Sequence, residues 1–407
     1  MTDALDIWVH ARRVGRLEAV ASSRSFIFGY HENACPEDFI SLSMPVEERL
    51  FEDRMLFPIF QQNLPEGELR ALLGTRFSKT LTLIDDFDFL AVCGPYWRGR
   101  VRLSEMDGEP KAFGRPLLLD ELLMQDSNEL FEELIGKYGF ATATRSGVQP
   151  KLALQVEDHR KIKPAYRTTL WTDDKIVKFE NDDTDYPGIA IDEFLCMTAA
   201  REAGIAVPGF AISDDARRLI IDRFDETESG IALGFEEAAT LMLFHAVEKY
   251  ASSYERMCRV LLEEISESHR EAARISLAKQ LLLMVFIGNG DAHLKNFGVI
   301  YSGRSDVRLA PAYDIVCTTI YLKKDLPALG FEGRKTWFTG DALVSRVAKA
   351  AGLSEDAVLA YVGQIEEGIQ RAIQLGEIRF RGQPKQASLV TALSEHWEIR
   401  RQQQSRG

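Results

Sequence analysis

A short polar segment in the second half of the chain limits the possible folds more than any other part of the sequence. An apolar helix is expected to end at Gly288, and the segment that follows, residues 288–297, reads GNGDAHLKNF. Two short strands are expected next, at 297–301 and 307–310, joined by the turn SGRSD. Because the residues on both sides have helical spacing, this segment and its hairpin interrupt an otherwise helical unit.

An acid and an amide lie five residues apart in this segment. Asp291 and Asn296 have the spacing D-x-x-x-x-N of a kinase catalytic loop, in which the Asp takes the proton of the accepting hydroxyl and the Asn binds Mg²⁺. The hairpin ends in APAYD, which puts Asp314 where kinases keep a second metal-binding acid. Mg²⁺ is commonly held by one or two carboxylates together with phosphate oxygens. An Asp and an Asn at this spacing are also common turn residues, so the interpretation depends on the hairpin and Asp314 as well.

A lysine upstream fits the same chemistry. Lys178 lies in a predicted strand, 175–179, on the face that also carries Ile176, where an apolar residue is expected. Such a lysine either extends to solvent at a strand edge or binds phosphate. Glu193, in the helix predicted to follow, is where the acid that pairs with a kinase lysine is expected, and Asp192 is the alternative.

Two further features are weaker. Residues 146–151, SGVQPK, lie between two predicted strands, where a kinase has the loop that covers the phosphates. The segment is not a Walker A motif and lacks repeated glycines, and one Gly and one Pro between strands usually indicate a hairpin. His293 follows Asp291 by two residues, and it is either a structural residue or one that holds the loop near a nucleotide.

The hydrophobic pattern divides the chain into three parts. Residues 1–115 are predicted to be β-rich, with helical spacing at 50–73, and they carry no catalytic cluster, which favours a binding or scaffolding module. Residues 116–225 alternate between strand and helix, and residues 226–407 are mainly helical. The predicted fold class is α+β, a protein-kinase-like fold of two lobes with a β-rich N-terminal subdomain and small lobe and a mainly helical C-terminal lobe. Helices are predicted at 190–203, 235–250, 254–265, 269–287, 340–351, 354–375 and 385–403, the first of them stopped by Gly204.

Composition and charge exclude several classes of protein. The net charge of −13 disfavours a protein that binds nucleic acid through its own surface, because phosphate contacts need clustered cations. The five cysteines form no CxxC pair, which argues against a zinc site and a disulfide framework and fits a reducing compartment. No run of about 18 apolar residues is present, and the N-terminus lacks a basic region followed by an apolar one. We therefore expect a cytoplasmic protein without a membrane span or signal peptide.

Together these segments resemble the HipA family of bacterial toxin kinases. The resemblance extends over nearly the whole chain, and the catalytic-loop and LAPAYD motifs are specific. It implies a kinase fold of two lobes, an N-terminal subdomain fused to the smaller lobe, and ATP and Mg²⁺ as cofactors. The stretches that carry it are IWVHARRVGRL from Ile7, QNLPEGELR from Gln62, SGVQPKLAL from Ser146, IVKFE from Ile176, DEFLCMTAAREAGIAVP from Asp192, IIDRFD from Ile220, IGNGDAHLKNFGV from Ile287 and LAPAYDI from Leu309.

The family's functional residues are carried over by motif. The resemblance implies that Asp291 is the catalytic base and that Asn296 and Asp314 bind the metal. It further implies that Lys178 holds the α- and β-phosphates, that 146–151 forms the phosphate loop, and that 222–224 is the hinge that receives the adenine. The residues implied to bind ATP are Ser146, Gly147, Val148, Gln149, Pro150, Lys151, Lys178, Asp222, Arg223, Phe224, His293, Leu294, Lys295, Asn296, Tyr313 and Asp314.

Regulation by autophosphorylation is also implied. In this family a Ser of the phosphate loop is phosphorylated, which expels the loop and silences the enzyme. The candidate hydroxyls here are Thr144 and Ser146, with Arg145 between them. Thr144 aligns with the phosphorylated position and Ser146 with the second serine of a Ser-x-Ser variant, so both remain open. Gly290 and Ala292 differ from the commoner residues of the catalytic loop without touching the chemical residues.

The resemblance also implies partners. Family members phosphorylate aminoacyl-tRNA synthetases, above all glutamyl-tRNA synthetase, and so stop translation. A small helix-turn-helix antitoxin of the HipB kind neutralises them, and the pair represses its own operon, with the operator DNA bound mainly through the antitoxin.

Three alternative functions remain. A catalytically silent corepressor has no reason to keep the whole set of Lys178, Asp291, Asn296 and Asp314. A small-molecule kinase shares the loop but would lack the N-terminal subdomain. A metal-dependent hydrolase built on Asp291, His293 and Asp314 leaves Lys178 unexplained.

Overall fold

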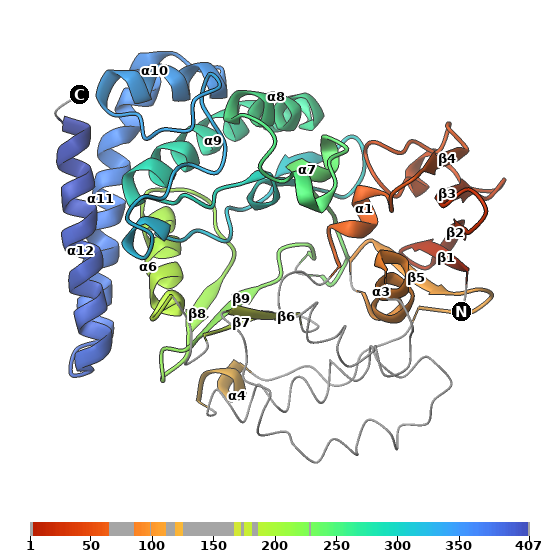
Figure 1. Cartoon of the computed structure of the whole chain (residues 1–407), viewed down its shortest axis with the longest axis horizontal. Helices are drawn as coiled ribbons and strands as arrows, with labels where there is room; N and C mark the ends of the chain where they lie inside the picture. The colour runs from red at the N-terminus through yellow and green to blue at the C-terminus, as the bar shows by residue number, and fades with distance from the viewer. Residues whose placement is uncertain are drawn as a thin grey trace.

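The described part of the chain forms three antiparallel sheets and a group of long helices, so the predicted α+β class is confirmed (Figure 1). The N-terminal sheet lies at one end of the molecule and the last two helices at the other. The computed structural model describes residues 3–64, 85–97, 99–110, 119–124, 167–171, 175–180, 186–227 and 229–405.

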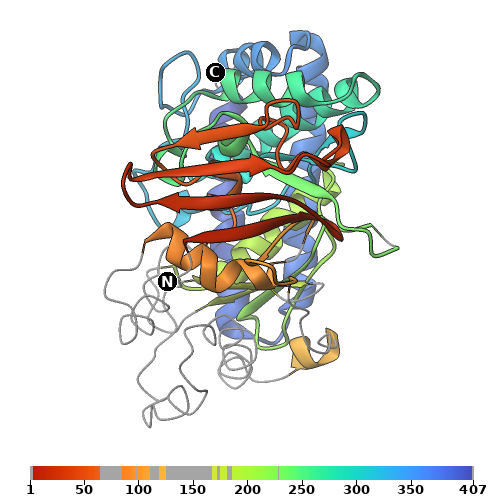
Figure 2. The same ribbon diagram turned by 90° about the vertical axis from the view of Figure 1, so that its right-hand side faces the viewer.

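The first sheet has the strand order β4-β3-β2-β1-β5, and it is formed by β1 (Ala4–Val9), β2 (Arg12–Val20), β3 (Ser25–Tyr30), β4 (Leu50–Asp53) and β5 (Val101–Glu105). Figure 2 shows this sheet facing the viewer. Leu5, Ile7 and Val9 alternate along β1 and are all buried, as expected of a strand with one face on the core. The helical spacing at 50–73 is wrong at its start, because 50–53 pairs with β3. Short helices accompany the sheet: α1 (Pro58–Gln61) and α3 (Asp86–Cys93).

The second sheet has the strand order β6-β7-β9-β8, and its strands are β6 (Arg167–Trp171), β7 (Lys175–Glu180), β8 (Phe210–Ile212) and β9 (Arg218–Asp222). The short helix α4 (Leu119–Met124) precedes it in the chain. Helix α6 (Ile189–Glu202) packs against β7, β8 and β9. It ends before Gly204, whose φ of +73° is the left-handed conformation that the sequence predicted for a stop at this glycine.

The third sheet has the order β10-β11-β12 and consists of β10 (Gly234–Glu237), β11 (Gly298–Tyr301) and β12 (Val307–Leu309). The predicted hairpin after the polar segment is therefore confirmed. The helix predicted at 235–250 is wrong: its start is β10, which pairs with a strand sixty residues further on, followed by the single turns α7 (Ala238–Leu241) and η6 (Ala246–Glu248). A pairing so distant in sequence overrides local spacing.

The other helices lie within a few residues of their predicted positions, and they are α8 (Tyr254–Glu264), α9 (Glu267–Ile287), α10 (Gly340–Ala351), α11 (Glu355–Arg379) and α12 (Pro384–Ser405). Residues 281–287 of α9 are at most 3% exposed, so the helix ends deep in the core. Trp397 and Arg400 from α12 donate hydrogen bonds to backbone carbonyls in this last stretch of α9. In the part of the chain that the structure describes, no helix has the length and apolar character needed to cross a bilayer.

Helices α6 and α11 approach each other unusually closely. A Cβ atom at Gly368 of α11 would lie 2.6 Å from the carbonyl oxygen of Ala199, and one at Gly376 would lie 2.8 Å from Cδ2 of Leu195. Small residues at a helix crossing allow the backbones to come this near, so α6 is fixed against the helical lobe.

The N-terminal sheet unit is joined to the third sheet by a buried acid. Glu236 of β10 is fully buried and accepts hydrogen bonds from the hydroxyl of Ser41 (2.6 Å), the backbone N–H of Leu42 (2.8 Å) and the hydroxyl of Tyr301 (2.7 Å). Burial raises the pKa of Glu236, and the three donors oppose that shift. The junction holds β10 and β11 in place beside the polar loop, which enters β11.

Candidate active site

The polar loop begins where α9 is forced to end. Gly288 has a φ of +77°, and a Cβ there would lie 2.0 Å from the hydroxyl oxygen of Thr319. At Gly290 a Cβ would lie 2.0 Å from a carboxylate oxygen of Asp325, and the Gly290 N–H donates to Thr318 (2.7 Å). Gly288 is therefore required by its backbone conformation and by close packing, whereas a side chain at 290, where the sequence departs from the commoner family pattern, would have to displace the carboxylate of Asp325.

Asp291 follows as the exposed acid of the loop. Its side chain is 50% exposed, and the hydroxyl of Tyr250 donates to its Oδ1 at 2.9 Å. Its own N–H donates to the side chain of Asn289 at 3.0 Å, which fixes the backbone of the turn. A carboxylate with one oxygen bound and solvent access can accept a proton from an approaching hydroxyl.

Asn296 links the loop to the second acid. Its Oδ1 accepts from the backbone N–H of His293 at 2.9 Å, and its Nδ2 donates to Oδ2 of Asp314 at 2.7 Å. His293 is buried and its Nδ1 accepts from the N–H of Lys295 at 3.3 Å. Burial lowers the pKa of His293, although the nearby Asp291 opposes the shift. A neutral imidazole that caps this turn fits the structural role considered for His293.

Lys178 reaches the same cluster from β7. Its Nζ lies 2.6 Å from Oε1 of Glu193 and 2.7 Å from Oδ1 of Asp314, and its side chain is 11% exposed. The lysine therefore binds two acids inside the structure and does not extend to solvent. The predicted partner Glu193 is confirmed, and the alternative is wrong, because the buried carboxylate of Asp192 accepts from the backbone N–H of Cys317 at 3.0 Å.

Asp314 has an unusual backbone. Its φ of +57° lies in the left-handed region, where Asp is among the few non-glycine residues found regularly. This conformation follows the β-hairpin and turns the side chain so that Oδ1 meets Lys178 and Oδ2 meets Asn296. Residues held in such conformations concentrate at functional sites.

Aromatic rings line the connection between the second and third sheets. Phe224 stacks on Tyr313 with ring centroids 5.4 Å apart, and Phe235 meets both rings edge-on. The hydroxyl of Tyr313 donates to the carbonyl of Lys295 at 2.7 Å, which joins this layer to the polar loop. The Nζ of Lys295 lies 3.3 Å from Oε2 of Glu237.

The other predicted residues lie in different surroundings. Asp222 is half exposed and pairs with Lys175, and Arg223 pairs with Asp225. The side chain of Leu294 is fully buried in the main core, so it supports the loop from behind. The segment Ser146 to Lys151 and Thr144 lie outside the described residues.

Two residues that contact the polar loop were not identified from the sequence. Tyr250 lies in the wrongly predicted helix 235–250, and it contacts Asp291 across 41 residues of chain. Glu237 lies in the same segment and reaches Lys295. No local pattern signals either contact, because both depend on how β10 and the turn after it lie against the loop.

A cation could be held by oxygen atoms of this cluster. No group of three or more His, Cys, Asp or Glu side chains with metal-binding geometry occurs among the residues that the structure describes. Asn296 and Asp314 nevertheless supply a carboxylate and an amide oxygen, which is the sparse set that Mg²⁺ accepts when phosphates and waters complete its shell.

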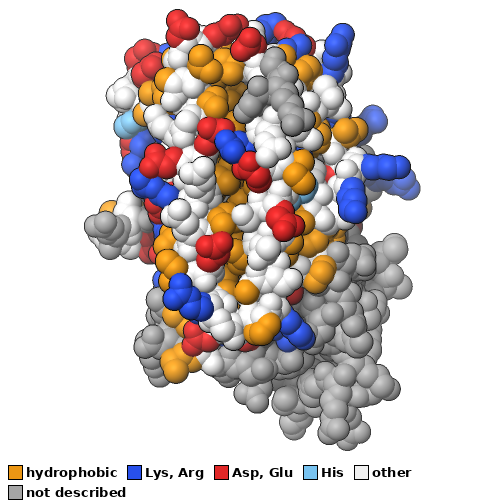
Figure 3. Space-filling view, turned by 90° about the vertical axis from the view of Figure 1, so that its left-hand side faces the viewer, with side chains coloured by type: hydrophobic (Ala, Val, Ile, Leu, Met, Phe, Trp, Pro, Cys, Tyr) orange, Lys and Arg blue, Asp and Glu red, His pale blue; other side chains and the backbone are white. Residues whose placement is uncertain are grey.

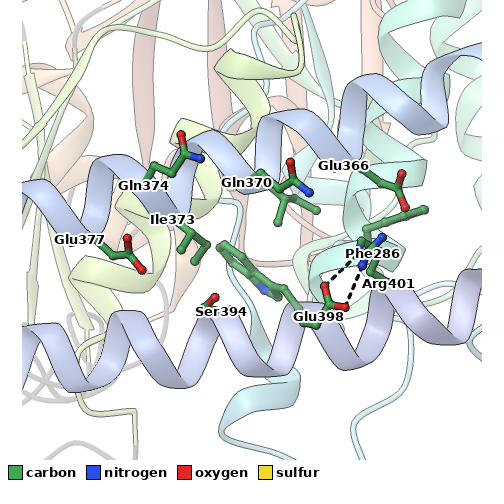
Figure 4. Close-up of a pocket in the computed structure, with 11 residues that line it drawn as sticks. Phe286, Glu366, Gln370, Ile373, Gln374, Glu377, Ser394, Glu398 and Arg401 are labelled. Carbon is green, nitrogen blue, oxygen red and sulfur yellow. Dashed lines mark hydrogen bonds and ion pairs between the residues drawn. The ribbon is translucent and has the colours of Figure 1, made fainter.

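A groove lies away from this cluster, between α11 and α12. Figure 3 shows that face, with hydrophobic side chains along the line between the two helices. The groove has a volume of about 290 Å³. Figure 4 shows its side chains, and it is lined by Phe286, Glu366, Ile369, Gln370, Ile373, Gln374, Glu377, Ser394, Trp397, Glu398 and Arg401, none of which belongs to the predicted site.

The sequence is similar to several proteins that are described as kinases. Among curated proteins, the chain is 28% identical over 423 residues to Y4dM of Sinorhizobium fredii, with 96% of each chain covered, and the name of that protein provisionally calls it a kinase. A Haemophilus influenzae protein with the same provisional description is 28% identical over 192 residues, which cover 43% of this chain and 53% of that protein.

A solved structure extends the likeness to the fold. A chain of the complex of HipA, HipB and operator DNA from Shewanella oneidensis MR-1 superposes with a TM-score of 0.69 at 18% identity, covering 97% of this chain and 96% of that one. The chain therefore has the fold of that HipA chain, which the sequence led us to expect to be a protein-kinase-like fold of two lobes.

Two family models match separate parts of the sequence. Residues 5–104 match the HipA N-terminal domain, and residues 143–373 match the HipA-like C-terminal domain. The second match alone spans more than half of the chain, and the chain therefore belongs to the HipA family.

Proposed function

We propose that this chain is an ATP- and Mg²⁺-dependent Ser/Thr protein kinase that acts as the toxin of a toxin–antitoxin pair. The observation that carries the proposal is the contact of Lys178 with both Glu193 and Asp314. A kinase needs a lysine that is held by an acid and directed at the phosphates, next to the acid that binds metal. An ion pair that only stabilised the strand would need one acid, whereas Lys178 also contacts Asp314 at the end of a hairpin.

The proposed reaction transfers the γ-phosphoryl group of ATP to a protein hydroxyl. The hydroxyl oxygen forms a bond to the γ-phosphorus, and the bond from that phosphorus to the oxygen shared with the β-phosphate breaks, so that ADP leaves. The hydroxyl proton passes to Asp291 and then to solvent. Lys178 would bind the α- and β-phosphates, and the segment 146–151 would cover them.

Asn296 and Asp314 would hold the Mg²⁺ ion. Bound there, Mg²⁺ neutralises charge on the phosphates during transfer. Both oxygens of Asp314 accept hydrogen bonds, from Lys178 and Asn296, so the ion would compete with these donors for them.

The adenine would lie against the connection formed by residues 222–224. The stacked rings of Phe224 and Tyr313 give this place an apolar aromatic wall, which suits a flat base. His293, Leu294 and Lys295 would support the loop on which the nucleotide rests. We place the domain limits of this enzyme at 1–115, 116–225 and 226–407.

The proposed partners follow from family membership. The substrate would be an aminoacyl-tRNA synthetase, with glutamyl-tRNA synthetase the first to test, and the enzyme would act in the cytoplasm. A HipB-like helix-turn-helix antitoxin would neutralise it and carry most of the contact with operator DNA, in keeping with a net charge of −13 on this chain. Autophosphorylation at Thr144 or Ser146 would silence it.

The test is transfer of label from γ-labelled ATP to protein in a cell lysate and to purified glutamyl-tRNA synthetase. Label is expected in a protein band with the unaltered chain and not with the variant Asp291→Asn. Asp306→Asn, which changes an acid in the hairpin turn, is the matched control and should transfer normally. Label in a small molecule would identify a small-molecule kinase, and ATP binding without transfer would identify a silent corepressor.

A further inference from the structure

Tyr250 contacts the proposed catalytic base from outside the catalytic loop. Its hydroxyl donates to Oδ1 of Asp291 at 2.9 Å, and among the described residues no group donates to Oδ2. The nearest nitrogen of His293 lies 4.0 Å from Oδ1, which is too far for a hydrogen bond. The phenol of Tyr250 therefore makes the two oxygens of this half-exposed carboxylate different, because it binds only Oδ1.

The ring of Tyr250 is held from several sides. It meets the imidazole of His293 edge-on, with centroids 5.2 Å apart and planes at 74°. The ammonium groups of Lys249 and Lys335 lie 5.3 and 5.9 Å from its centroid, within the range of cation–π attraction. The N–H of Leu294 donates to the carbonyl of Lys249 at 3.2 Å, which ties the segment to the loop itself. Tyr250 is 42% exposed, and these contacts direct its hydroxyl at Asp291.

A free aspartate side chain rotates, and its two oxygens exchange places by a turn about the terminal bond. A base must have its accepting oxygen within about 2.6–3.2 Å of the hydroxyl at the moment of transfer. A donor that binds one oxygen therefore decides which oxygen remains for the substrate.

We propose that Tyr250 is a positioning residue that binds Oδ1 of Asp291, so that Oδ2 receives the proton of the accepting hydroxyl. The inference rests on the proposed phosphotransfer. The rival arrangement is that the phenol occupies the place of the substrate hydroxyl and blocks the base. The two arrangements predict opposite effects when the phenol oxygen is removed.

The variant Tyr250→Phe keeps the ring and removes the hydroxyl. We expect kcat to fall by about tenfold, the usual size for one hydrogen bond to a charged group, while KM for ATP stays the same. The phenol contacts the proposed base and is not among the groups proposed to bind the nucleotide. A fall in kcat at unchanged KM therefore separates a loss of positioning from a loss of nucleotide binding.

Tyr254→Phe is the matched control. The hydroxyl of Tyr254 donates to the carbonyl of Ala292 at 3.0 Å, so it supports the same loop without contacting a carboxylate. This variant should melt at a lower temperature and lose less kcat than Tyr250→Phe. The charged or titratable side chains around the Tyr250–Asp291 pair, His293, Lys249 and Lys335, are unchanged in both variants.

The outcomes separate the inference from the proposed function. Phosphotransfer by the unaltered chain, with full kcat in Tyr250→Phe, overturns the positioning role and leaves the kinase assignment standing. A rise in kcat in that variant also overturns it, in favour of a blocking phenol, and so does an equal fall in kcat in Tyr254→Phe. No transfer by the unaltered chain overturns the function and the inference together.

Discussion

Replacing Lys178 with Met should separate the structural role of this lysine from its role toward phosphate. The substitution keeps a long apolar stem on β7 and removes the ammonium group that contacts Glu193 at 2.6 Å and Asp314 at 2.7 Å. We expect loss of both phosphotransfer and part of the folding stability, because Glu193 is only 1% exposed.

The size of the loss follows from burial. Removing one member of a buried ion pair costs about 3–5 kcal/mol, because the remaining charge stays out of water. The contact with Asp314 adds little, since that side chain is 32% exposed and pairs open to solvent are worth about 0–1 kcal/mol. A loss of about 3 kcal/mol corresponds to a fall in Tm of roughly 3–4 °C for a chain of 407 residues.

Thermal melts and transfer assays on two further variants complete the test. The double variant Lys178→Met with Glu193→Leu replaces the pair by apolar groups and should recover most of the Tm without recovering transfer. Lys175→Met, on the same strand, removes a partner of the half-exposed Asp222 and should change the Tm by no more than about 1 °C. The reasoning is refuted if Lys178→Met melts like the unaltered chain, or if the double variant is no more stable than the single one.

The remaining predictions concern the second acid and the regulatory loop. Asp314→Asn and Asp314→Ala should both lose transfer. The Asn variant should be more stable than the Ala variant by about 1 kcal/mol, because Asn tolerates the left-handed backbone at φ +57° better than Ala does. Equal Tm values for the two variants would contradict this. Protein expressed with an active site should carry phosphate at Thr144 or Ser146 by mass spectrometry, and Asp291→Asn protein should not. A phosphate would add about −1.5 to −2 charges beside the phosphates of ATP. Phosphorylated protein that keeps full activity would therefore exclude regulation by this phosphate.

The parts of the site that are close together in sequence could be predicted from it. Asp291 and Asn296 belong to one loop, and that loop is expected to lead into a hairpin that carries Asp314. Lys178 and Glu193 are 15 residues apart on a strand and the following helix, a short connection that restricts which side chains can meet. Such spacings are fixed by local geometry, and the structure places these residues together.

The parts that depend on distant pairing could not be predicted. Residues 234–237 have no local signal for a strand, and they become one because β11 offers hydrogen bonds from residues 298–301. The same error concealed Tyr250 and Glu237, which reach the loop only once that segment lies beside it. Burial of Glu236 against Ser41 likewise joins parts of the chain 195 residues apart.

Helix α6 has little freedom to swing away from the helical lobe. It carries Glu193, and the glycines of α11 at 368 and 376 bring it so near that even a methyl group would collide. Moving Glu193 out of reach of Lys178 by rotating this helix would expose Leu195 and Ala199, both fully buried. Turning the enzyme off through this helix would therefore cost a whole apolar interface. A small molecule designed to trap such a rotated helix would first have to separate two packed helices, whereas a ligand directed at the half-exposed side chain of Asp291 would not.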